Sequence, residues 1–258
     1  MANASLIPID QPSTRCGDCQ VRRMALFKQV PEDKLAWTQD YRKGQFVLKA
    51  REHLYYEDEE HGQVYTLFDG CIKLYKTLHT GKMQAMRFAL PGDFLGFQGD
   101  LCNAMHHGAQ ALTDCVLCAF PKQAVSRMLC EHPEIATELI AKNARVMATC
   151  QEHLLSTGAR SAIESIAFTL VELNHRLELF RVFRPDSQAL AGTGIPMTQE
   201  DLADAVGLTP IHVNRTLRQL REMGMIYCTK GRIEIIDGAR LKEVAKFNPR
   251  LIEDAQLL

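Results

Sequence analysis

One stretch near the end of the chain, residues 197–236, constrains the fold more than any other part of the sequence. It reads MTQEDLADAVGLTPIHVNRTLRQLREMGMIYCTKGRIEII. Thr198 is a suitable N-cap for a helix, and Asp201, three residues later, is placed to complete a capping box. Gly207 permits the tight turn that ends this helix, and Thr209 caps the next one. The pattern predicts two short helices joined by a turn, which is a helix-turn-helix.

The second of these helices is expected to contact DNA, because the second helix of such a motif enters the major groove. It begins with Pro210, whose missing N–H has no cost at the first helical position. Its apolar residues recur at helical spacing and predict a buried stripe of Val213, Leu217 and Leu220. The residues predicted to bind DNA are Thr198, Thr209, Ile211, His212, Asn214, Arg215 and Arg218.

Two β-prone runs follow, at residues 225–228 and 232–236, and the Thr-Lys-Gly of residues 229–231 separates them. They predict a hairpin, which is the wing of a winged helix. Between Pro210 and Arg232 the basic residues face a single acid, Glu222. A local basic surface on a chain of formal net charge −1 favours neutralisation of phosphates, so these features together predict binding to double-stranded DNA.

Length and composition are those of a globular protein. The 258 residues are enough for two domains. No apolar run approaches the ~20 residues that span a bilayer, and the N-terminal residues lack the pattern of a signal peptide. Nine cysteines, an odd number placed mostly in apolar runs, do not resemble a secreted disulfide framework. We therefore expect a cytoplasmic protein with free thiols and no membrane partner.

Earlier in the chain the pattern is first that of strands. Residues 1–15 are polar and predict a mobile arm. From Lys43 to Pro121, runs of period two alternate with glycine-containing turns, which predicts a β-sandwich or β-roll. Asp69-Gly70 and Thr80-Gly81 have the composition of hairpin turns.

A helical pattern then extends from Pro121 to Leu155, with apolar residues at steps of three, four and seven. A second subunit is one solution for burying such a stripe, and packing on the chain's own β-roll is the alternative. Helix-turn-helix proteins generally bind two half-sites ~34 Å apart, so we expect a homodimer. The residues predicted to lie in its interface are Ile135, Leu139, Val146, Cys150 and His153. A further helix is predicted from Ala159 to Leu179.

The predicted fold class is therefore α+β. We divide the chain into an N-terminal arm (1–34), a β-roll (35–130), a dimerisation helix (131–157), a winged helix-turn-helix (158–240) and a C-terminal tail (241–258). The sequence contains no pattern of paired carboxylates, no Ser-His-Asp arrangement and no phosphate-binding loop, so an enzyme is not expected.

This order of elements resembles the cAMP receptor protein / fumarate–nitrate reduction regulator superfamily. The resemblance covers nearly the whole chain after Lys43. It is carried by Lys43-Gly44, by Leu90-Pro-Gly-Asp-Phe-Leu-Gly96, by Ala109-Gln-Ala-Leu112 and by the helix-turn-helix. It implies a β-roll like that of cyclic-nucleotide-binding domains. It also implies a homodimeric transcription factor that contacts RNA polymerase and changes its DNA affinity on receiving a signal.

The resemblance suggests cyclic nucleotide as one candidate signal. Members that bind it carry a Gly-Glu pair for the ribose and an Arg-Ser pair for the phosphate. Here Phe97 follows Gly96, and His107 stands where the arginine would be. Phe97 cannot accept a hydrogen bond from a ribose hydroxyl, and a neutral imidazole is a poor substitute for a bidentate guanidinium. We do not expect cAMP to bind.

Oxygen or redox state is the signal that the sequence favours. The oxygen-sensing branch holds an iron–sulfur cluster on cysteines, and this chain matches three of the ligand positions at Cys16, Cys19 and Cys118. The remaining N-terminal position is Ala25. Asp18 and Cys115 are the candidates for the fourth ligand. Cys115 lies three residues from Cys118, so in a regular strand the two side chains face opposite sides.

Other readings of the cysteines stay open. The pairs 16/19 and 115/118 have the spacing of a zinc site, and Cys16 and Cys19 have that of a dithiol that cycles with a disulfide. Strand cysteines are most often small core residues. A β-roll that binds a small organic effector is the second hypothesis for the signal, and in that case the cysteines are incidental.

The resemblance also assigns roles on the recognition helix. Related regulators carry Glu, then Ser or Gly, then Arg, at the positions of Ile211, Asn214 and Arg215. By resemblance, Arg215 reads guanine through a bidentate contact. Asn214 can pair with adenine or hold a phosphate, and Ile211 can pack on a thymine methyl group.

Overall fold

The computed structural model describes residues 6–10, 14–31, 35–98, 104–190 and 192–248. The fold is α+β, as predicted. The chain forms two compact units, and each is described by itself below. The first contains Met1–Lys76, Ala89–Ala141 and Arg181–Ala191, and the second contains Thr77–Phe88, Lys142–Phe180 and Gly192–Leu258. Within the described ranges, no helix is both long enough and apolar enough to cross a membrane.

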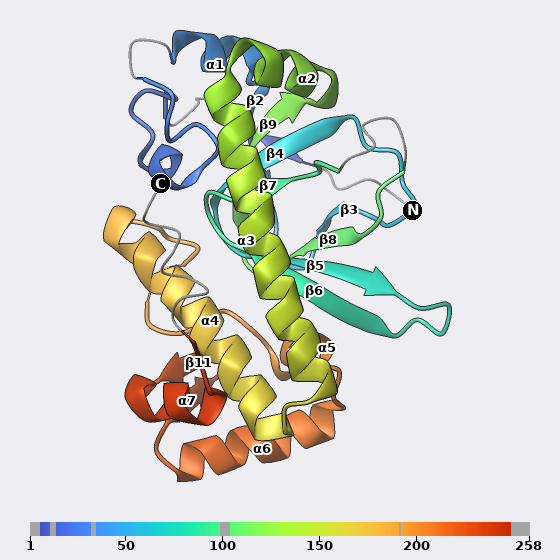
Figure 1. The fold of residues 1–258 in the computed structure, drawn as a ribbon, viewed down its shortest axis with the longest axis vertical. Coiled ribbons are helices and arrows are strands. Elements are labelled where there is room, and N and C mark those ends of the chain that lie inside the picture. Colours follow the sequence, from blue (N-terminus) through green and yellow to red (C-terminus); the bar gives the residue numbers. More distant parts are fainter. Residues whose placement is uncertain (1–5, 11–13, 32–34, 99–103, 191, 249–258) are drawn as a thin grey trace. The chain divides into compact units, whose positions relative to one another are not determined.

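Two antiparallel sheets form the β-roll (Figure 1). One has the strand order β1-β2-β9-β4-β7, and the other has the order β3-β8-β5-β6. The strands are β1 (Ile7–Pro8), β2 (Gly44–Leu48), β3 (His53–Tyr55), β4 (Gln63–Asp69), β5 (Ile72–Thr77), β6 (Met83–Ala89), β7 (Phe94–Leu95), β8 (Gly108–Ala111) and β9 (Cys115–Pro121). The period-two runs of the sequence thus became strands, because alternate residues can face a common core.

The core of the roll lies between these sheets and determines which way each cysteine of β9 faces. Cys115, Leu117 and Ala119 alternate along the strand and belong to the buried cluster inside the roll. Cys118 pairs across with Gln45 of β2 and lies on the opposite face of the sheet. The strand period therefore separates Cys115 from Cys118, as the sequence indicated.

Both predicted hairpin turns are present. Gly70 joins β4 to β5 with a φ of +100°, a conformation that favours glycine. A Cβ at this position would lie 2.6 Å from Cys115 Sγ, so the turn also requires a residue without a side chain. Gly81, with a φ of +80°, joins β5 to β6.

The N-terminal segment is more structured than a mobile arm. Ile7 and Pro8 form β1, which pairs with Val47 and Phe46 of β2. A short 3-10 helix, η1 (Gln20–Met24), follows the Cys16–Cys19 turn, and α1 (Ala36–Tyr41) precedes β2. The arm prediction is wrong for residues 7–8, and its residues 1–5 and 11–13 lie outside the described part of the chain.

The single helical stretch expected after Pro121 is two helices. They are α2 (Lys122–Glu131) and α3 (Pro133–Gly158). The break falls at His132, because the proline that follows disfavours a helical conformation for the preceding residue and lacks an N–H to continue α2.

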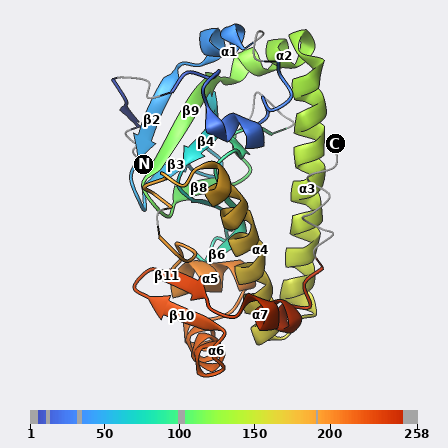
Figure 2. The same ribbon diagram turned by 90° about the vertical axis from the view of Figure 1, so that its left-hand side faces the viewer.

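The second unit contains the helix-turn-helix and its wing (Figure 2). Its elements are α4 (Ala162–Phe183), α5 (Gln199–Val206), α6 (Pro210–Glu222), β10 (Ile226–Thr229), β11 (Arg232–Ile235) and α7 (Gly238–Ala245). The helix predicted to end at Leu179 continues to Phe183.

The sequence analysis missed α7. The predicted tail begins at residue 241, but Leu241 and Ala245 are fully buried, so this part of it belongs to the folded unit. Asp237 caps the helix by accepting a hydrogen bond from the backbone N–H of Arg240. An N-cap residue followed by apolar residues at helical spacing is the sequence pattern that could have predicted this helix.

Candidate functional site

The caps of the helix-turn-helix form as predicted. Thr198 Oγ1 accepts a hydrogen bond from the backbone N–H of Asp201 at 3.1 Å, and Asp201 Oδ2 accepts one from the backbone N–H of Thr198. Gly207 ends α5 in the left-handed conformation, with a φ of 70°. Thr209 Oγ1 caps α6 by accepting from His212 N at 3.3 Å. Local sequence signals therefore fix the two helices and the turn between them.

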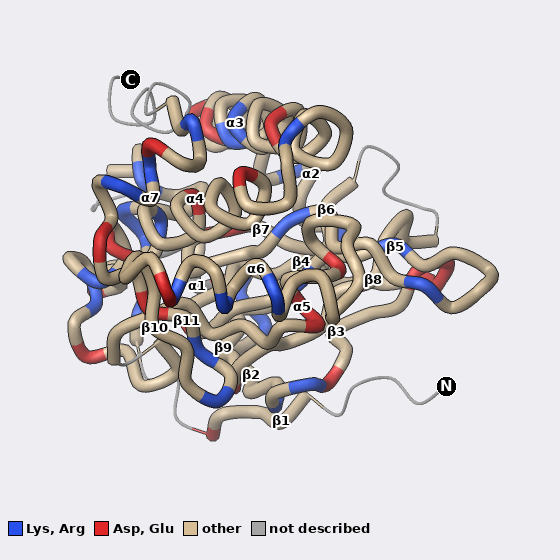
Figure 3. The backbone as a smooth tube through the Cα atoms, turned by 90° about the horizontal axis from the view of Figure 1, so that it is seen from below, with Lys and Arg blue, Asp and Glu red and all other residues tan. Residues whose placement is uncertain are grey.

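The recognition helix α6 presents a polar and basic surface. Val213, Leu217 and Leu220 are buried, which leaves the opposite face to solvent. Figure 3 marks the basic positions along α6 in blue. Of the residues predicted to bind DNA, five are exposed and Thr198 and His212 are half-buried. The exposed ones are Thr209, Ile211, Asn214, Arg215 and Arg218.

Three of these side chains differ in how they are engaged. Ile211 is 85% exposed, which is unusual for a large apolar residue and suits contact with a base methyl group. Arg215 makes no ion pair or hydrogen bond with any residue that the structure describes. Arg218 donates through Nε to Glu222 at 2.8 Å, but an exposed pair of this kind stabilises by only ~0.3–0.5 kcal/mol. Both guanidinium groups are therefore available to DNA.

The wing is a regular antiparallel hairpin. Ile226 pairs with Ile235 and Thr229 pairs with Arg232, so Lys230 and Gly231 form its tip. Ile233 also bridges to Ile195, which attaches the wing to the segment before α5. The basic residues of the wing are thus held on the same unit as α6.

One contact in the helix-turn-helix was not predicted. Asn214 Nδ2 on α6 donates a 2.8 Å hydrogen bond to Oε1 of Gln199 on α5. Both side chains are exposed. The bond leaves Asn214 Oδ1 as an acceptor and fixes the plane of the amide, so Gln199 is a positioning residue for Asn214. In the sequence, Gln199 could have been noticed because it directly follows the N-cap residue Thr198 at the start of α5.

The long helix α3 exposes a different face from the one predicted for dimerisation. Ile135 and Leu139 are buried within the chain, with exposures of 1% and 8%, so a second subunit cannot cover them. His153 packs edge-on against Phe168 at 5.7 Å. Val146 and Cys150 are half-buried. The predicted interface is wrong for Ile135 and Leu139, because the chain's own fold uses that stripe.

Large apolar side chains are exposed on α3 instead, and three of them share one face. These three recur at intervals of seven residues: Ile140, Met147 and Leu154. An interval of seven is close to two helical turns, so the three lie along one face of the helix. The sequence offered this signal beside the predicted stripe, but periodicity alone did not show which stripe the chain buries.

The structure brings the three predicted cysteine ligands into one neighbourhood of the first unit. Cys16 and Cys19 lie in one turn, in which Cys19 N donates a hydrogen bond to Cys16 O at 3.4 Å. Burial raises the pKa of the Cys118 thiol to about 11, and the charges of Cys19 and Cys16 contribute to the rise. Burial also raises the pKa of Cys19, with a contribution from Cys16. These mutual effects place the three thiols in the same region of the first unit.

Cys115 is not part of this group. Its Sγ lies 3.5 Å from the backbone oxygen of Cys71 and 3.3 Å from that of Thr113, inside the roll. Burial raises its pKa to about 12. The structure therefore corrects the suggestion that Cys115 supplies a fourth ligand. Asp18 is exposed beside Cys19, and its role as a ligand stays a prediction.

Comparisons with known proteins agree with this architecture. A model of the Crp-like helix-turn-helix domain matches residues 164–244, and a model of the cyclic nucleotide-binding domain matches residues 45–132. The chain is 30% identical to the transcriptional activatory protein AadR of Rhodopseudomonas palustris, over 91% of this chain and 97% of that protein. It is 29% identical to the nitrogen fixation regulation protein FixK of Bradyrhizobium diazoefficiens, over 93% and 98% of the two chains.

A solved structure is also similar. FixK2 from Bradyrhizobium japonicum superposes with a TM-score of 0.67 at 28% identity, over 78% of this chain and 96% of that one. The chain belongs to the Crp/Fnr family of transcription regulators. It lies closer to the FNR-like branch than to the cAMP-binding branch. Members of this family bind DNA and are not enzymes, so the helix-turn-helix described above is the DNA-binding element.

The FNR-like branch implies an iron–sulfur cluster, whose cube takes four ligands. Cys16, Cys19 and Cys118 lie in one region, whereas Ala25 occupies the remaining N-terminal position and is 2% exposed in the core. No group of three or more His, Cys, Asp and Glu side chains is arranged to hold a metal ion in the described parts of the chain. The residues present therefore do not form a complete ligand set for the cluster.

The residues at which the family resemblance places the phosphate of a cyclic nucleotide make contacts within the roll. His107 Nε2 lies 3.1 Å from the Tyr55 hydroxyl, and Gln98 Oε1 accepts from His106 N at 3.1 Å. Gly108 lies against the Tyr75 ring, which a Cβ at that position would overlap. Side chains of His107 and Gln98 are thus hydrogen-bonded within the protein.

Replacement of Gln199 by Ala should weaken base discrimination at the position that Asn214 contacts. Loss of one hydrogen bond of this kind is worth ~0.5–1.5 kcal/mol, so we expect roughly a two- to tenfold loss of preference at that base pair. Binding to half-sites selected from random DNA, with each base pair varied in turn, measures the effect. Gln219→Ala, an exposed glutamine on α6, is the matched control. An unchanged preference in Gln199→Ala would contradict the positioning role.

Proposed function

We propose that this Crp/Fnr regulator changes its affinity for DNA in response to oxygen or redox state at Cys16, Cys19 and Cys118. The observation that supports the proposal most is the common neighbourhood of three cysteines from two segments far apart in the sequence.

The chemistry follows from the protonation of these thiols. Burial raises the pKa of Cys19 and of Cys118, so both are protonated at neutral pH. Oxidation of Cys16 and Cys19 to a disulfide releases two protons and two electrons, and a peroxide accepts them as it is reduced to water. The product is uncharged and covalently closes the turn before η1, which changes the local structure without adding charge.

Thiolate-ligated iron is the alternative form of the same sensor, with Asp18 or an external ligand in the fourth position. Iron and acid-labile sulfide analysis of protein purified without oxygen separates the two forms. Bound iron with broad visible absorption that bleaches in air supports the cluster. Colourless, iron-free protein that still changes its DNA affinity on oxidation supports the dithiol.

We further propose that the regulator works in the cytoplasm as a homodimer on two DNA half-sites. The exposed face of α3 supports the dimer, because large apolar residues that repeat along one exposed helix face are typical of an interaction surface. The family resemblance extends the proposal to a contact with RNA polymerase. The name of AadR describes that relative as an activator, and we propose the same sign of regulation here.

Replacement of both Cys16 and Cys19 by Ser should abolish the response to oxidation. We expect the wild-type affinity for its selected half-sites to change by about 5- to 150-fold on oxidation, the usual range of coupling between two sites. The double variant should bind equally under both conditions. Fluorescence anisotropy with labelled DNA, first without oxygen and then after peroxide, measures both.

Cys130→Ser is the control for this experiment, because Cys130 is exposed on α2 and is not one of the three grouped cysteines. Its response should equal that of the wild type. A double Cys16/Cys19 variant that still responds to oxidation by the wild-type factor would refute the proposal.

A further inference from the structure

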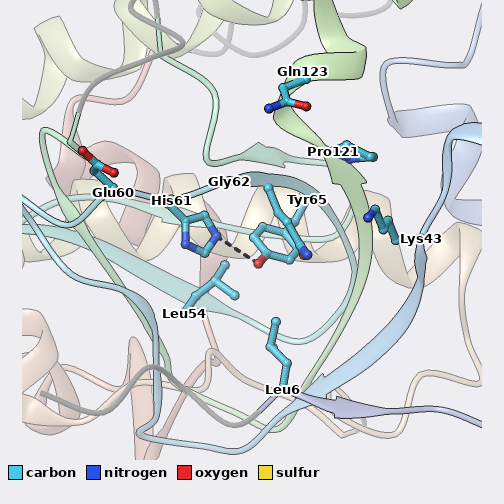
Figure 4. Close-up of a pocket in the computed structure, with 10 residues that line it drawn as sticks. Leu6, Lys43, Leu54, Glu60, His61, Gly62, Tyr65, Pro121 and Gln123 are labelled. Carbon is cyan, nitrogen blue, oxygen red and sulfur yellow. Dashed lines mark hydrogen bonds between the residues drawn. The ribbon is translucent and has the colours of Figure 1, made fainter.

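A cavity of about 430 Å³ opens in the first unit, where β4 begins and β9 ends. Its volume lies within the range of small-molecule sites, ~300–1,000 Å³. Figure 4 shows side chains from several elements around it, among them the loop before β4 and the first residues of α2. None of its lining residues belongs to β7 or to residues 96–107, and none is a cysteine. The cavity is therefore separate from the sites discussed so far.

One basic and one acidic side chain lie at the rim of the cavity. Lys43 and Glu60 lie on opposite sides of the cavity, with His61 and Tyr65 between them (Figure 4). Both are exposed, and neither forms an ion pair with another residue in the described part of the chain. Each charge is thus free to meet a ligand group of opposite sign.

One further basic residue and one further acidic residue lie near the cavity, so the local net charge stays close to zero. On the basic side, Lys122 is 4% exposed between the lining residues Pro121 and Gln123. On the acidic side, Glu59 accepts a hydrogen bond from Tyr56 N at 3.1 Å. A site with one basic side and one acidic side suits a ligand that carries both charges better than a simple anion or cation.

The surface between the charges carries no charged side chain and combines polar groups with apolar ones. His61 Nε2 lies 2.9 Å from the Tyr65 hydroxyl, and the His61 ring packs against the ring of Tyr55 at 5.2 Å. Burial lowers the pKa of His61, which favours the neutral imidazole. Leu6 and Leu54 complete this surface. An apolar ligand body between two charged ends would lie on it without leaving a charge unpaired.

Gln63 supplies a polar group that the fold leaves unsatisfied. It lines the cavity, and its Oε1 is buried without a hydrogen-bond donor among the described residues. Leaving such an acceptor unpaired costs about 1–3 kcal/mol. A turn of this amide toward a ligand N–H group would remove the penalty, so the side chain favours a ligand that carries a donor.

We propose that this cavity binds a small organic zwitterion whose carboxylate and ammonium are separated by an apolar chain. The carboxylate meets Lys43 and the ammonium meets Glu60. The chain between them lies over Leu6, Leu54 and the paired rings of His61 and Tyr65. Because no cysteine lines the site, binding is independent of the proposed redox response.

Titration calorimetry on the full-length protein tests the proposal with γ-aminobutyrate, δ-aminovalerate and ε-aminocaproate as probes. Caproate and hexylamine carry the same body with a single charge and serve as ligand controls. We expect at least one of the three amino acids to bind, at least about tenfold more tightly than either control, since each charged hydrogen bond contributes at that level.

Variants locate the binding. Lys43→Met and Glu60→Gln should each weaken binding by about tenfold or more, and both positions are exposed enough to change without unfolding the protein. Lys82→Met, at an exposed lysine that does not line the cavity, should bind as the wild type does. The Cys16/Cys19 double Ser variant should also bind normally, which separates this site from the sensor.

Two results with the wild-type protein, and one with the variants, would overturn the proposal. One is the absence of binding by all three amino acids. The other is equal affinity for caproate or hexylamine, which would show that one charge is enough. Binding that survives both Lys43→Met and Glu60→Gln would place the ligand elsewhere and would equally refute it.

Discussion

Met147→Asp should convert the regulator from a dimer into monomers. Met147 is 63% exposed on α3, between Ile140 and Leu154, which are 70% and 73% exposed. A buried methionine contributes ~1.5–3 kcal/mol, and a two-fold interface contains it twice. The dimer dissociation constant should therefore rise by roughly two to four orders of magnitude. Sedimentation velocity measures the change over a range of protein concentrations.

The DNA affinity should fall with the dimer, because a monomer binds one half-site instead of two. Leu78→Asp is the matched control, since Leu78 is 61% exposed but lies next to the β5–β6 turn and not on α3. It should leave the dimer intact. A Met147→Asp protein that remains dimeric with native circular dichroism would show that α3 is not the interface.

Arg215→Ala should remove specific DNA binding while leaving weak, general binding in place. A bidentate contact between arginine and guanine is worth ~1–3 kcal/mol of discrimination, and a dimer makes it on both half-sites. We expect the ratio of specific to random-DNA affinity to fall by about tenfold or more per half-site. Competition between labelled selected DNA and unlabelled random DNA measures the ratio.

Arg218→Ala is the comparison on the same helix. A residue that binds phosphate should, when removed, weaken binding to all sequences about equally. The slope of log affinity against log salt should also become shallower by about 0.9 for each phosphate that is no longer neutralised. Arg218 forms an ion pair with Glu222 in the free protein, but that exposed pair is too weak to prevent Arg218 from binding a phosphate. Equal losses on specific and random DNA for Arg215→Ala would remove its assignment as the base reader.

The helix-turn-helix was predictable because its signals are local. The Thr198–Asp201 capping box, the turn at Gly207 and the cap at Thr209 each depend on residues within a few positions of one another. Such interactions form the same way wherever the segment lies. The strands were predictable for the same reason, since alternation of side chains reports a sheet with one buried face.

The apolar stripes of α3 show what periodicity cannot decide. The helix carries two apolar stripes, and the sequence alone did not show that the fold would bury Ile135 and Leu139 and leave Ile140 and Met147 in water. Which stripe meets the core depends on the packing of α3 against distant segments. One example is Lys28, whose Nζ pairs with the buried carboxylate of Glu138 at 2.9 Å.

The remaining sites depend on contacts between residues far apart in the sequence. The cavity brings Lys43, Glu60 and Gln123 together, and no spacing in the sequence predicts that arrangement. The same holds for the bond between Gln199 and Asn214, whose partners lie on different helices. For the cysteines, resemblance supplied the grouping of Cys16 with Cys118. Strand alternation argued against Cys115, and the structure places it inside the roll.

The central claim is that oxidation at the grouped cysteines changes DNA affinity. The most direct measurement follows one sample of the wild-type protein through reduction, oxidation and reduction again, with its affinity for the selected half-sites measured by anisotropy at each stage. We predict a change on oxidation that reverses on reduction, together with the loss and return of free thiols at Cys16 and Cys19. An affinity that is the same at all three stages, while those thiols are demonstrably oxidised, would contradict the account.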